Sequence, residues 1–313
     1  MHERRPVRCQ DGAHAQRVRA GRPVSEDAAV SVAGRRLRLS SLDKLLYPAT
    51  ETTKGEVLSY YAQVAQVLLP HVARRPVTRI RWPHGVSDES FFEKNLPSGA
   101  PSWLPRARVD EITYPLLEDV AGLTYLVNLN SIELHVPQWT VGDDGARENP
   151  DRLVVDLDPG KPAGLHECAQ VALLVRERLD DLGLDVHPVT SGSKGMQLYA
   201  ALDGRLTSDE VRDLAQRLGQ ELTKQRPEVV LWKMTKSLRP GKVLLDWSQN
   251  VAAKPTISPY SLRGRETPTV ATPRTWEEVE LGARERDALR QLTFEEVLTR
   301  LDEHGDLLAH LLR

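Results

Sequence analysis

Apolar residues at helical spacing mark the first well-defined element of the chain. The apolar positions of this run are Val57, Tyr60, Tyr61, Val64, Val67 and Leu68. Thr53 and Glu56 have the spacing of a capping box just before the run, and Pro70 follows it. Because a capping box satisfies free backbone N–H groups and proline disrupts a helix, the pattern predicts a helix that begins after Thr53 and ends near Pro70.

Three later segments also carry helical patterns. One of them ends at Gly183, and its apolar residues lie on a single helical face: Leu165, Ala169, Ala172, Val175, Leu179 and Leu182. In another, Thr207 and Glu210 provide a capping box ahead of Val211, Leu214, Leu218 and Leu222. The segment 275–312 is expected to be mostly helical.

Short apolar runs between these segments predict strands. The runs span residues 77–82, 132–136, 153–157, 186–189, 196–200 and 243–245. Strands and helices mix without a strict βαβ period, so we expect an α/β fold of the mixed α+β kind with more than one sheet. A shift in composition indicates a domain boundary near residues 145–150.

Length and composition are those of a globular protein. The chain has 313 residues, of which 40% are hydrophobic and 27% charged, and its net charge of −2 means that any affinity for nucleic acid must come from local charge. Cys9 and Cys168 are far apart in the sequence, which favours a reducing compartment over a disulfide framework. No apolar run approaches the length of a membrane span, so we expect a cytoplasmic protein without a membrane segment.

The first residues of the chain are basic and show no clear periodicity. Up to residue 40 there are nine arginines against four acidic residues, a local excess of five positive charges. We expect a flexible basic tail over residues 1–34. Such a tail is an electrostatic arm for a phosphate backbone, a solvated extension, or the product of a misassigned start codon.

Three aspartates, Asp156, Asp158 and Asp246, end two of the predicted strands. Because side chains alternate faces along a strand, Asp156 and Asp158 point the same way and repel each other unless something positive neutralises them. Three carboxylates suit two divalent cations, and such sites serve phosphoryl transfer. An isolated Asp-x-Asp is also typical of a turn, for which Pro159 and Gly160 supply the chemistry.

A small glycine-rich turn, Ser191-Gly192-Ser193-Lys194-Gly195, joins two of the predicted strands. Glycines allow the backbone to approach a ligand, successive amide groups can form an anion nest, and a lysine adds a charge suited to phosphate. A polar hairpin turn is the alternative interpretation. Nearness in sequence to the paired aspartates favours binding of a nucleotide triphosphate.

Residues 232–265 form a basic stretch with seven lysines and arginines against one acid, Asp246, an excess of six positive charges. Trp232, Trp247 and Tyr260 are interleaved with them. Basic side chains with aromatic rings suit a polynucleotide, since they contact phosphates and stack on bases. The alternative is a solvated charged face.

Two adjacent aromatics and one histidine are further candidates. Phe91 and Phe92 lie in a polar setting and can stack on bases, but we expect one of them in the core because neighbours in an extended chain face opposite ways. His135 is either a phosphate or nucleotide contact or a structural residue of its strand.

Taken together, these segments resemble the polymerase domain of bacterial DNA ligase D, which belongs to the archaeo-eukaryotic primase superfamily. The matching segments lie in the family's order at residues 47–50, 81–83, 91–94, 135–139, 156–160, 190–195, 234–250 and 259–265. The resemblance covers about residues 36–311. It implies a primase-polymerase domain over 35–313, with an N-terminal α/β module at about 35–148 and an RRM-like catalytic module at about 149–313.

The resemblance implies template-directed nucleotide addition at DNA breaks or short gaps with a 5′-phosphate, in non-homologous end joining or gap repair. The substrates would be a nucleotide triphosphate, often a ribonucleotide, and double-stranded DNA, with two divalent ions, Mn²⁺ or Mg²⁺, as cofactors. The sequence has no ligase motif of the Lys-x-Asp-Gly type. We therefore expect a stand-alone polymerase whose partners are Ku and a separate ATP-dependent DNA ligase.

Single residues acquire roles from the same resemblance. The metal ligands would be Asp156, Asp158 and Asp246. The nucleotide would be held by His135, Ser191, Lys194 and Arg263, with Arg265 nearby. Phe91 and Phe92 would stack on the base and template, Lys44 and Lys54 would bind the downstream 5′-phosphate, and Arg239 would handle the primer.

The chain departs from the family pattern at a few positions. Gln197 stands where a histidine is usual, so we expect weaker nucleotide binding or a lower rate, because glutamine donates a hydrogen bond but carries no charge. Ser41 and Ile80 replace an expected asparagine and lysine near the 5′-phosphate pocket, and residues 106–113 look shortened relative to a loop that organises DNA ends.

Three other functions remain open. A primase or short-gap filler would differ in de novo synthesis or in the preferred gap length. A non-catalytic module that binds DNA ends and recruits Ku or a ligase would not need the acidic triad. A metal-dependent nuclease would use similar carboxylates but would have no purpose for the turn at 191–195.

Overall fold

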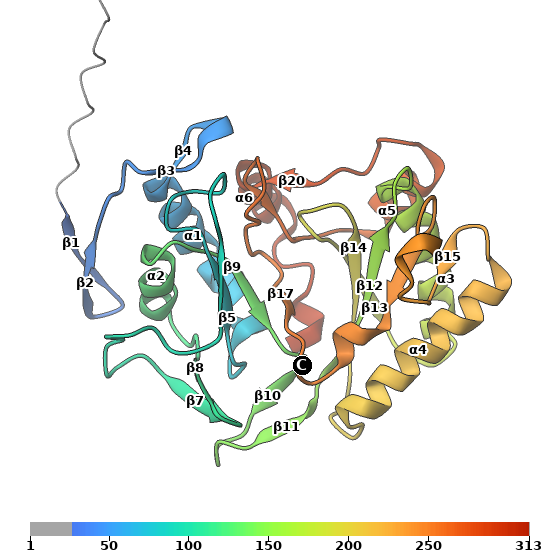
Figure 1. The fold of residues 1–313 in the computed structure, drawn as a ribbon, viewed down its shortest axis with the longest axis horizontal. Helices are drawn as coiled ribbons and strands as arrows, with labels where there is room; N and C mark the ends of the chain where they lie inside the picture. The colour runs from blue at the N-terminus through green and yellow to red at the C-terminus, as the bar shows by residue number, and fades with distance from the viewer. Residues whose placement is uncertain (1–26, 313) are drawn as a thin grey trace, which may run out of the picture.

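The structure is a computed structural model that describes residues 27–312. Two central β-sheets are each flanked by helices, and the chain crosses between them more than once (Figure 1). The helices are α1 (Lys54–Val72), α2 (Val120–Asn128), α3 (Leu165–Asp180), α4 (Ser208–Gln225), α5 (Trp276–Arg284) and α6 (Phe294–His304). Short 3₁₀ helices are η1 (Pro48–Thr50), η2 (Lys236–Leu238), η3 (Trp247–Asn250) and η4 (Ala309–Leu312). The mixed α/β class expected from the sequence is confirmed.

The first sheet is antiparallel throughout. Its strands, in spatial order, are β17 (Thr256–Ile257), β9 (Ser131–Val136), β5 (Thr78–Arg81) and β6 (Phe91–Glu93). Helices α1 and α2 pack on each other and form one hydrophobic core with the apolar residues of β9. β6 is an edge strand, so it pairs on one side only.

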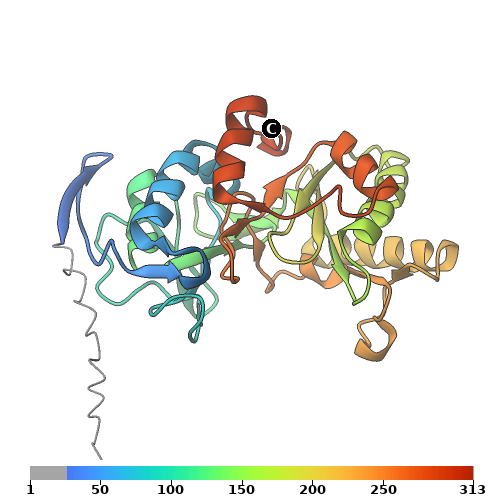
Figure 2. The same ribbon diagram turned by 90° about the horizontal axis from the view of Figure 1, so that it is seen from above.

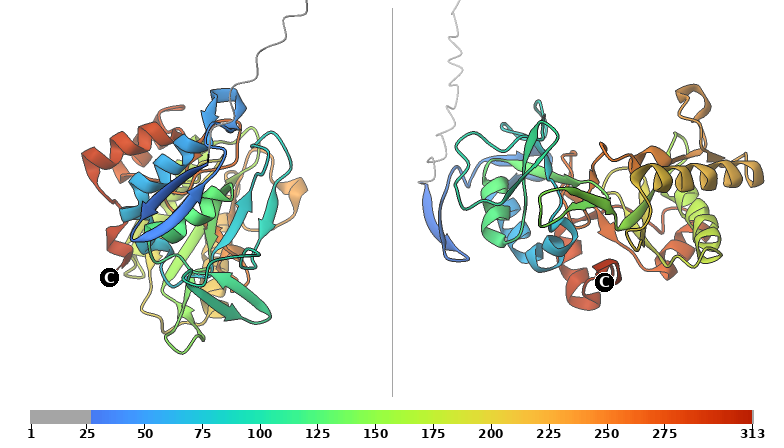
Figure 3. Two further views of the ribbon diagram at one scale, coloured as in Figure 1. Left: turned by 90° about the vertical axis from the view of Figure 1, so that its left-hand side faces the viewer. Right: turned by 90° about the horizontal axis from the view of Figure 1, so that it is seen from below.

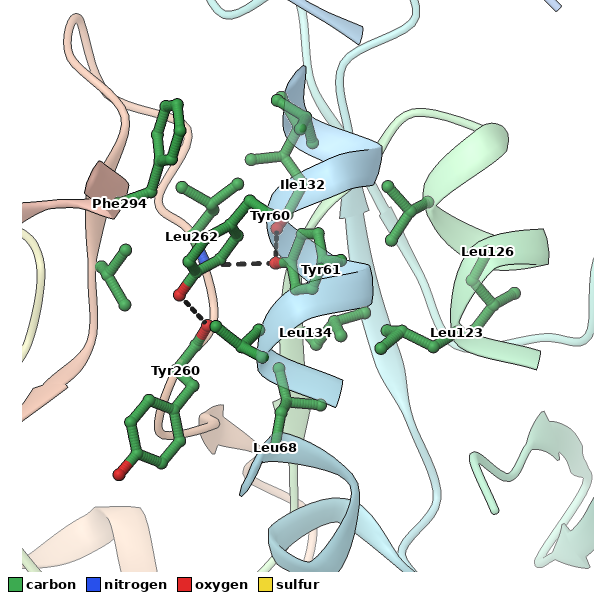
Figure 4. Close-up of a cluster of buried hydrophobic side chains, with 14 of the residues drawn as sticks. Tyr60, Tyr61, Leu68, Leu123, Leu126, Ile132, Leu134, Tyr260, Leu262 and Phe294 are labelled. Atoms are coloured by element: carbon green, nitrogen blue, oxygen red, sulfur yellow. Dashed lines mark hydrogen bonds between the residues drawn. The ribbon is translucent and has the colours of Figure 1, made fainter. Parts of the chain in front are cut away.

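Buried tyrosines tie this core to a segment two hundred residues away. Tyr60 of α1 donates a hydrogen bond to the carbonyl of Tyr260 at 2.7 Å. The hydroxyl of Tyr61 accepts from the amide of Leu262 at 3.0 Å and contacts the carbonyl of Ile132 (Figure 4). The tyrosine hydroxyls therefore satisfy backbone groups that would otherwise be buried without partners.

The second sheet carries the aspartates. Its strands, in order, are β15 (Val230–Leu231), β16 (Val243–Asp246), β12 (Arg152–Pro159), β14 (Met196–Ala201), β13 (Val186–Thr190) and β19 (Thr272–Pro273). All neighbours are antiparallel except β15 and β16. Leu153, Val155 and Leu157 face a core made with α3, α4 and α5. Because side chains alternate, Asp156 and Asp158 face away from these helices.

Small hairpins surround the two sheets. They are β1 (Ala28–Val32) with β2 (Arg35–Leu39), β3 (Leu45–Tyr47) with β4 (Thr52–Thr53), β7 (Arg106–Val109) with β8 (Ile112–Pro115), β10 (Trp139–Val141) with β11 (Arg147–Pro150), and β18 (Thr269–Val270) with β20 (Leu292–Thr293). The β1–β2 hairpin projects from the side of the first sheet (Figure 3).

The C-terminal part of the chain returns to the first core. β17 joins the first sheet, and Leu262, Phe294 and Val297 are buried against α1. α6 lies over the junction between the two sheets (Figure 2). The expected division at about residue 148 therefore does not describe these C-terminal segments, which pack with the N-terminal part.

Two predicted boundaries differ by a few residues from those of the structure. Pro70 lies inside α1, which continues to Val72, because a proline in the last turn sacrifices only one intrahelical hydrogen bond. The expected tail, residues 1–34, overlaps β1, whose side chains are alternately half-buried and exposed. β1 pairs with β2 through a turn at Ala33 and Gly34, which both have positive φ. Residues 1–26 of that tail lie outside the described residues.

The predicted strands are present, and 275–312 is mostly helical as expected. Between residues 27 and 312, none of the helices combines the length and the apolar character that crossing a membrane requires.

Candidate functional site

The register of the second sheet brings the predicted carboxylates together. Asp156 lies opposite Asp246 on β16 and opposite Gln197 on β14. Directly opposed residues of antiparallel strands point to the same face, and Asp158 lies two residues further along on that face. The three aspartates therefore occupy one surface of the sheet, on the side that faces the first sheet.

A cavity of about 280 Å³ opens above this surface. The predicted site residues that line it are Asp156, Asp158, Asp246, His135, Ser191, Lys194, Gln197, Arg263 and Arg265. Acidic side chains come from β12 and β16, while most of the basic ones come from β9, from the turn after β13 and from the segment after β17. The cavity thus has an acidic floor and basic walls.

Asp158 is neutralised by two cations. Its Oδ1 lies 2.8 Å from Lys194 Nζ, and its Oδ2 accepts a hydrogen bond from Arg239 at 3.2 Å. Arg239 lies in the loop between β15 and β16 and does not line the cavity. Its hydrogen bond to Asp158 is what connects it to the site. Asp246 instead accepts hydrogen bonds from the amide and hydroxyl of Ser248 in its own turn.

Asp156 is the least compensated of the three carboxylates. Burial, together with the nearby charges of Asp246 and Asp158, raises its pKa to about 7, while a hydrogen bond from Gln197 Nε2 at 3.1 Å opposes this rise. A buried carboxylate in such surroundings is stabilised by a cation.

The carboxylates form a suitable donor set for divalent ions, although they are not gathered around one point. Among residues 27–312, no three acidic, histidine or cysteine side chains lie close enough together to hold an ion. Asp158 is turned toward Lys194 and Arg239, so it has to exchange these partners for a metal. Mn²⁺ and Mg²⁺ prefer oxygen ligands, so carboxylates on one face, including the poorly compensated Asp156, suit either ion.

The turn after β13 requires its glycines. Gly192 has φ of +68°, and a Cβ there would lie 2.6 Å from Arg263 Cγ. A Cβ on Gly195 would lie 2.1 Å from the carbonyl oxygen of Leu157. The turn therefore packs closely against β12, which brings Ser191 and Lys194 to the cavity.

Three of the amide groups expected to form an anion nest at this turn are already paired within the protein. The amide of Ser191 donates to the carbonyl of Gly195 at 3.0 Å, and the amide of Ser193 to the hydroxyl of Ser191 at 3.3 Å. The amide of Gly192 donates to Gln291 Oε1 at 2.7 Å, and Gln291 Nε2 donates to Gly195. Because these three amides are already paired, an anion here would have to use other groups of the turn, such as the side chain of Lys194. Gln291 has no sequence pattern that could have predicted this role.

The opposite wall of the cavity is organised by a residue that the sequence analysis missed. Glu133 Oε2 lies 2.8 Å from His135 Nε2, and Glu133 Oε1 lies 3.3 Å from Arg263 Nε. The single available signal was an acid inside an otherwise apolar strand, two residues before His135 and therefore on the same face.

Both phenylalanines of β6 are exposed, Phe91 at 49% and Phe92 at 56%, so the expectation that one of them lies in the core is wrong. The reason is that β6 is a short edge strand without a covering layer on either side. Phe92 lies opposite Ile80, which lies opposite Glu133. Phe92 therefore shares the face of the first sheet that carries Glu133, although neither phenylalanine lines the cavity.

Lys44 and Lys54 lie together, away from the cavity, at the start of α1. Lys44 Nζ donates to the carbonyl of Pro83 at 2.7 Å, and Lys54 Nζ to that of Ser40 at 2.8 Å. Lys54 is buried, and burial together with the charge of Lys44 lowers its pKa to about 8. Two neighbouring ammonium groups at a helix N-terminus form a site suited to an anion.

Two aromatic residues of the basic stretch, Tyr260 and Trp247, are structural. Tyr260 is 2% exposed and belongs to the first core, so it cannot stack on a base. Trp247 packs against the second core and donates its indole N–H to the carbonyl of Trp232 at 3.1 Å. The stretch contributes to the site through Arg239, Asp246, Arg263 and Arg265.

Comparisons with known proteins agree with this geometry. A family model described as the LigD primase-polymerase domain matches residues 53–308. The chain is 51% identical over 280 residues to the multifunctional non-homologous end joining protein LigD of Mycolicibacterium smegmatis, covering 88% of this chain and 36% of that protein. It is 34% identical over 268 residues to the bifunctional non-homologous end joining protein LigD of Bacillus subtilis, covering 85% and 42%.

A solved structure, the polymerase domain from Mycobacterium tuberculosis Ligase D in complex with DNA, matches with a TM-score of 0.84 and 49% identity, covering 88% of this chain and 98% of that one. The chain spans well under half the length of the LigD relatives that it matches. The family match extends over most of the chain and includes the residues that line the cavity. The chain therefore belongs to the LigD primase-polymerase domain family.

Proposed function

We propose that this protein is a template-directed nucleotidyltransferase that adds nucleotides at DNA breaks or short gaps with a 5′-phosphate, in non-homologous end joining or gap repair. The observation that carries the proposal is the cavity in which three carboxylates of one sheet face His135, Lys194 and Arg263. Acidic groups for metal ions opposite basic groups for phosphates are the requirements of phosphoryl transfer.

The acidic floor would hold the metal ions. Two divalent ions, Mn²⁺ or Mg²⁺, bound by Asp156, Asp158 and Asp246 would supply charge neutralisation for the attacking hydroxyl and the departing pyrophosphate. Binding would separate Asp158 from Lys194 and Arg239. Lys194 would then be released toward the triphosphate, and Arg239 toward the primer.

The basic walls would hold the nucleotide. Arg263 presents a guanidinium that suits phosphate oxygens, and Lys194 a mobile point charge. Ser191 and Gln197 add neutral hydrogen-bond donors, and Arg265 adds a charge at the exposed rim. Their task is to align the α-phosphate with the primer 3′-hydroxyl, since positioning supplies much of the rate of such reactions.

DNA would contact the exposed features outside the cavity. Phe91 and Phe92 offer aromatic faces for the base and template, because both are exposed on an edge strand. Lys44 and Lys54 would bind the downstream 5′-phosphate. The partners of such an activity would be Ku and an ATP-dependent DNA ligase, and the reaction would take place in the cytoplasm.

Asp158→Ala tests the assignment. Primer extension should fall by about a thousandfold or more, the scale of losing a central electrostatic contribution to phosphoryl transfer. DNA binding should be retained or become tighter, because Lys194 and Arg239 lose their intramolecular partner. Both are measured on one gapped duplex, by extension and by fluorescence anisotropy.

Asp203→Ala is the matched control, since Asp203 is an exposed acid paired with Arg205 away from the cavity. It should leave both readouts unchanged. Full extension by the Asp158 variant would remove the metal-ligand assignment, and nicking of the template strand by the unmodified protein would favour a nuclease.

A further inference from the structure

A buried carboxylate, Glu133, joins two basic side chains of the cavity wall. Its side chain is 4% exposed. It reaches His135 Nε2 at 2.8 Å with one oxygen and Arg263 Nε at 3.3 Å with the other. Arg263 comes from a segment 130 residues away in the sequence, so Glu133 links two parts of the cavity wall that the backbone alone does not connect.

Glu133 also determines which nitrogen of His135 carries a proton. Burial alone would raise its pKa, but the hydrogen bond from His135 and the charge of Arg263 lower the pKa of Glu133 to about 2. An ionised carboxylate can only accept hydrogen bonds, so His135 Nε2 must be the donor. Nδ1 is then the ring nitrogen left for a ligand in the cavity.

The backbone around Arg263 is held by the same carboxylate. The amide of Gly264 donates to Glu133 Oε1 at 2.9 Å. A Cβ at this position would lie 2.1 Å from the ring of Trp82, so the close approach requires glycine. The carbonyl of Arg263 accepts from the hydroxyl of Tyr47 at 2.8 Å, which fixes the other side.

Charge explains why such a restraint is useful. Arg263 is attracted across the cavity by Asp156, the least compensated carboxylate of the floor. Lys194, which is attracted to the same group of carboxylates, forms an ion pair with Asp158 at 2.8 Å. Glu133 offers Arg263 a carboxylate on its own side and so keeps its guanidinium away from the metal-binding residues.

We propose that Glu133 is a positioning residue for nucleotide binding, which orients His135 and Arg263 and prevents Arg263 from occupying the metal site. Glu133 itself touches neither the nucleotide nor the reacting atoms. This role rests on the proposed nucleotidyl transfer in the same cavity. Its failure can be separated from failure of that function by measuring the unmodified protein in the same assay.

The test is steady-state primer extension by Glu133→Gln on a gapped duplex, with a ribonucleotide triphosphate and Mn²⁺. KM for the nucleotide should rise about tenfold, a usual loss when a supporting hydrogen-bond partner is removed, while kcat changes less. Glutamine keeps the shape and can accept from Gly264, but it lacks the charge that holds Arg263. Glu133→Asp restores the charge on a shorter side chain and should give an intermediate KM.

Asp306→Asn is the matched control. Asp306 also holds a buried histidine, His71, with Nε2 at 3.1 Å, and accepts from Tyr260, but none of these residues lines the cavity. This variant should lose stability and keep the KM of the unmodified protein. If Glu133→Gln does not fold, Glu133→Asp supplies the comparison.

An unchanged KM in the Glu133 variants, or an equal rise of KM in Asp306→Asn, would overturn the positioning role while leaving the polymerase intact. No extension by the unmodified protein would instead mark failure of the proposed function, and of the positioning role with it.

Discussion

Burying a carboxylate costs free energy unless a cation or several hydrogen bonds compensate it. Among the described residues, Asp156 has the amide of Gln197 as its side-chain partner, and its pKa rises to about 7 through burial and the charges of Asp246 and Asp158. Glu133 is also buried, but hydrogen bonds from His135 and Gly264 and the charge of Arg263 hold it ionised. Asp156 therefore lacks a compensating cation within the described part of the fold, whereas the charge of Glu133 is already compensated by its neighbours.

Gln197→His should lower KM for the nucleotide several-fold, because an imidazolium adds a charge-assisted hydrogen bond to phosphate that an amide cannot supply. The change also removes the amide that now donates to Asp156. Nucleotide titrations in the primer-extension assay measure the effect. Unchanged KM and kcat together would show that this departure from the family pattern has no consequence.

Single residues were predictable where local spacing dictates geometry. Asp156 and Asp158 follow the two-residue period of a strand, so their shared face was evident. Glu133 was missed because its partner Arg263 is distant in the sequence, and its position two residues before His135 does not by itself indicate that it contacts a second basic residue. The burial of one phenylalanine of β6 was wrongly expected, because alternation decides which way side chains point and not whether anything covers them.

At the scale of elements, helix starts were more predictable than strand pairing. The capping boxes of α1 and α4 are present as expected, since both depend on residues three apart. The pairing of β12 with both β14 and β16 creates the site, and no turn between neighbours enforces it. The turn predicted at residues 190–195 is present between β13 and β14, but the amides of Ser191, Gly192 and Ser193 are paired inside the protein, which the sequence did not predict.

The N-terminus of α1 should make the response to a 5′-phosphate depend on pH. Burial and Lys44 lower the pKa of Lys54 to about 8, and Asp27 partly opposes them. Lys54 is therefore charged at pH 7 and loses its proton as the pH rises through 8. The affinity for a gap with a 5′-phosphate, relative to a gap without one, should fall roughly tenfold between pH 7 and 9.

Lys54→Met is the control for this effect, because it removes the titrating group and should flatten the profile. A ratio that stays constant from pH 7 to 9 in the unmodified protein would mean that Lys54 does not contact the phosphate.

At the scale of the whole molecule, the two sheets are not independent units. C-terminal residues that follow the second sheet in the sequence complete the core of the first sheet, with Phe294 against Tyr60 at a ring separation of 5.6 Å. This crossing could not be predicted from a composition shift near residue 148. It holds Arg263 and the segment after β17 between the sheets, where the cavity forms.

Phe294→Ala should lower the free energy of unfolding by about 3–5 kcal/mol, because it leaves a cavity in the first core. Unfolding in urea should remain a single transition, since the core joins residues from both ends of the chain. Leu281→Ala, at a position 41% exposed, should change stability by less than about 0.5 kcal/mol. Two separate transitions would indicate that the halves fold independently.

The central claim is tested most directly by primer extension on a gapped duplex, with and without a 5′-phosphate on the downstream strand, using ribonucleotides or deoxyribonucleotides with Mn²⁺ or Mg²⁺. We predict template-dependent addition that requires the divalent ion and is stronger with the 5′-phosphate. DNA binding without any addition, under all of these conditions, would contradict the account and favour a module that binds DNA ends and recruits other repair proteins.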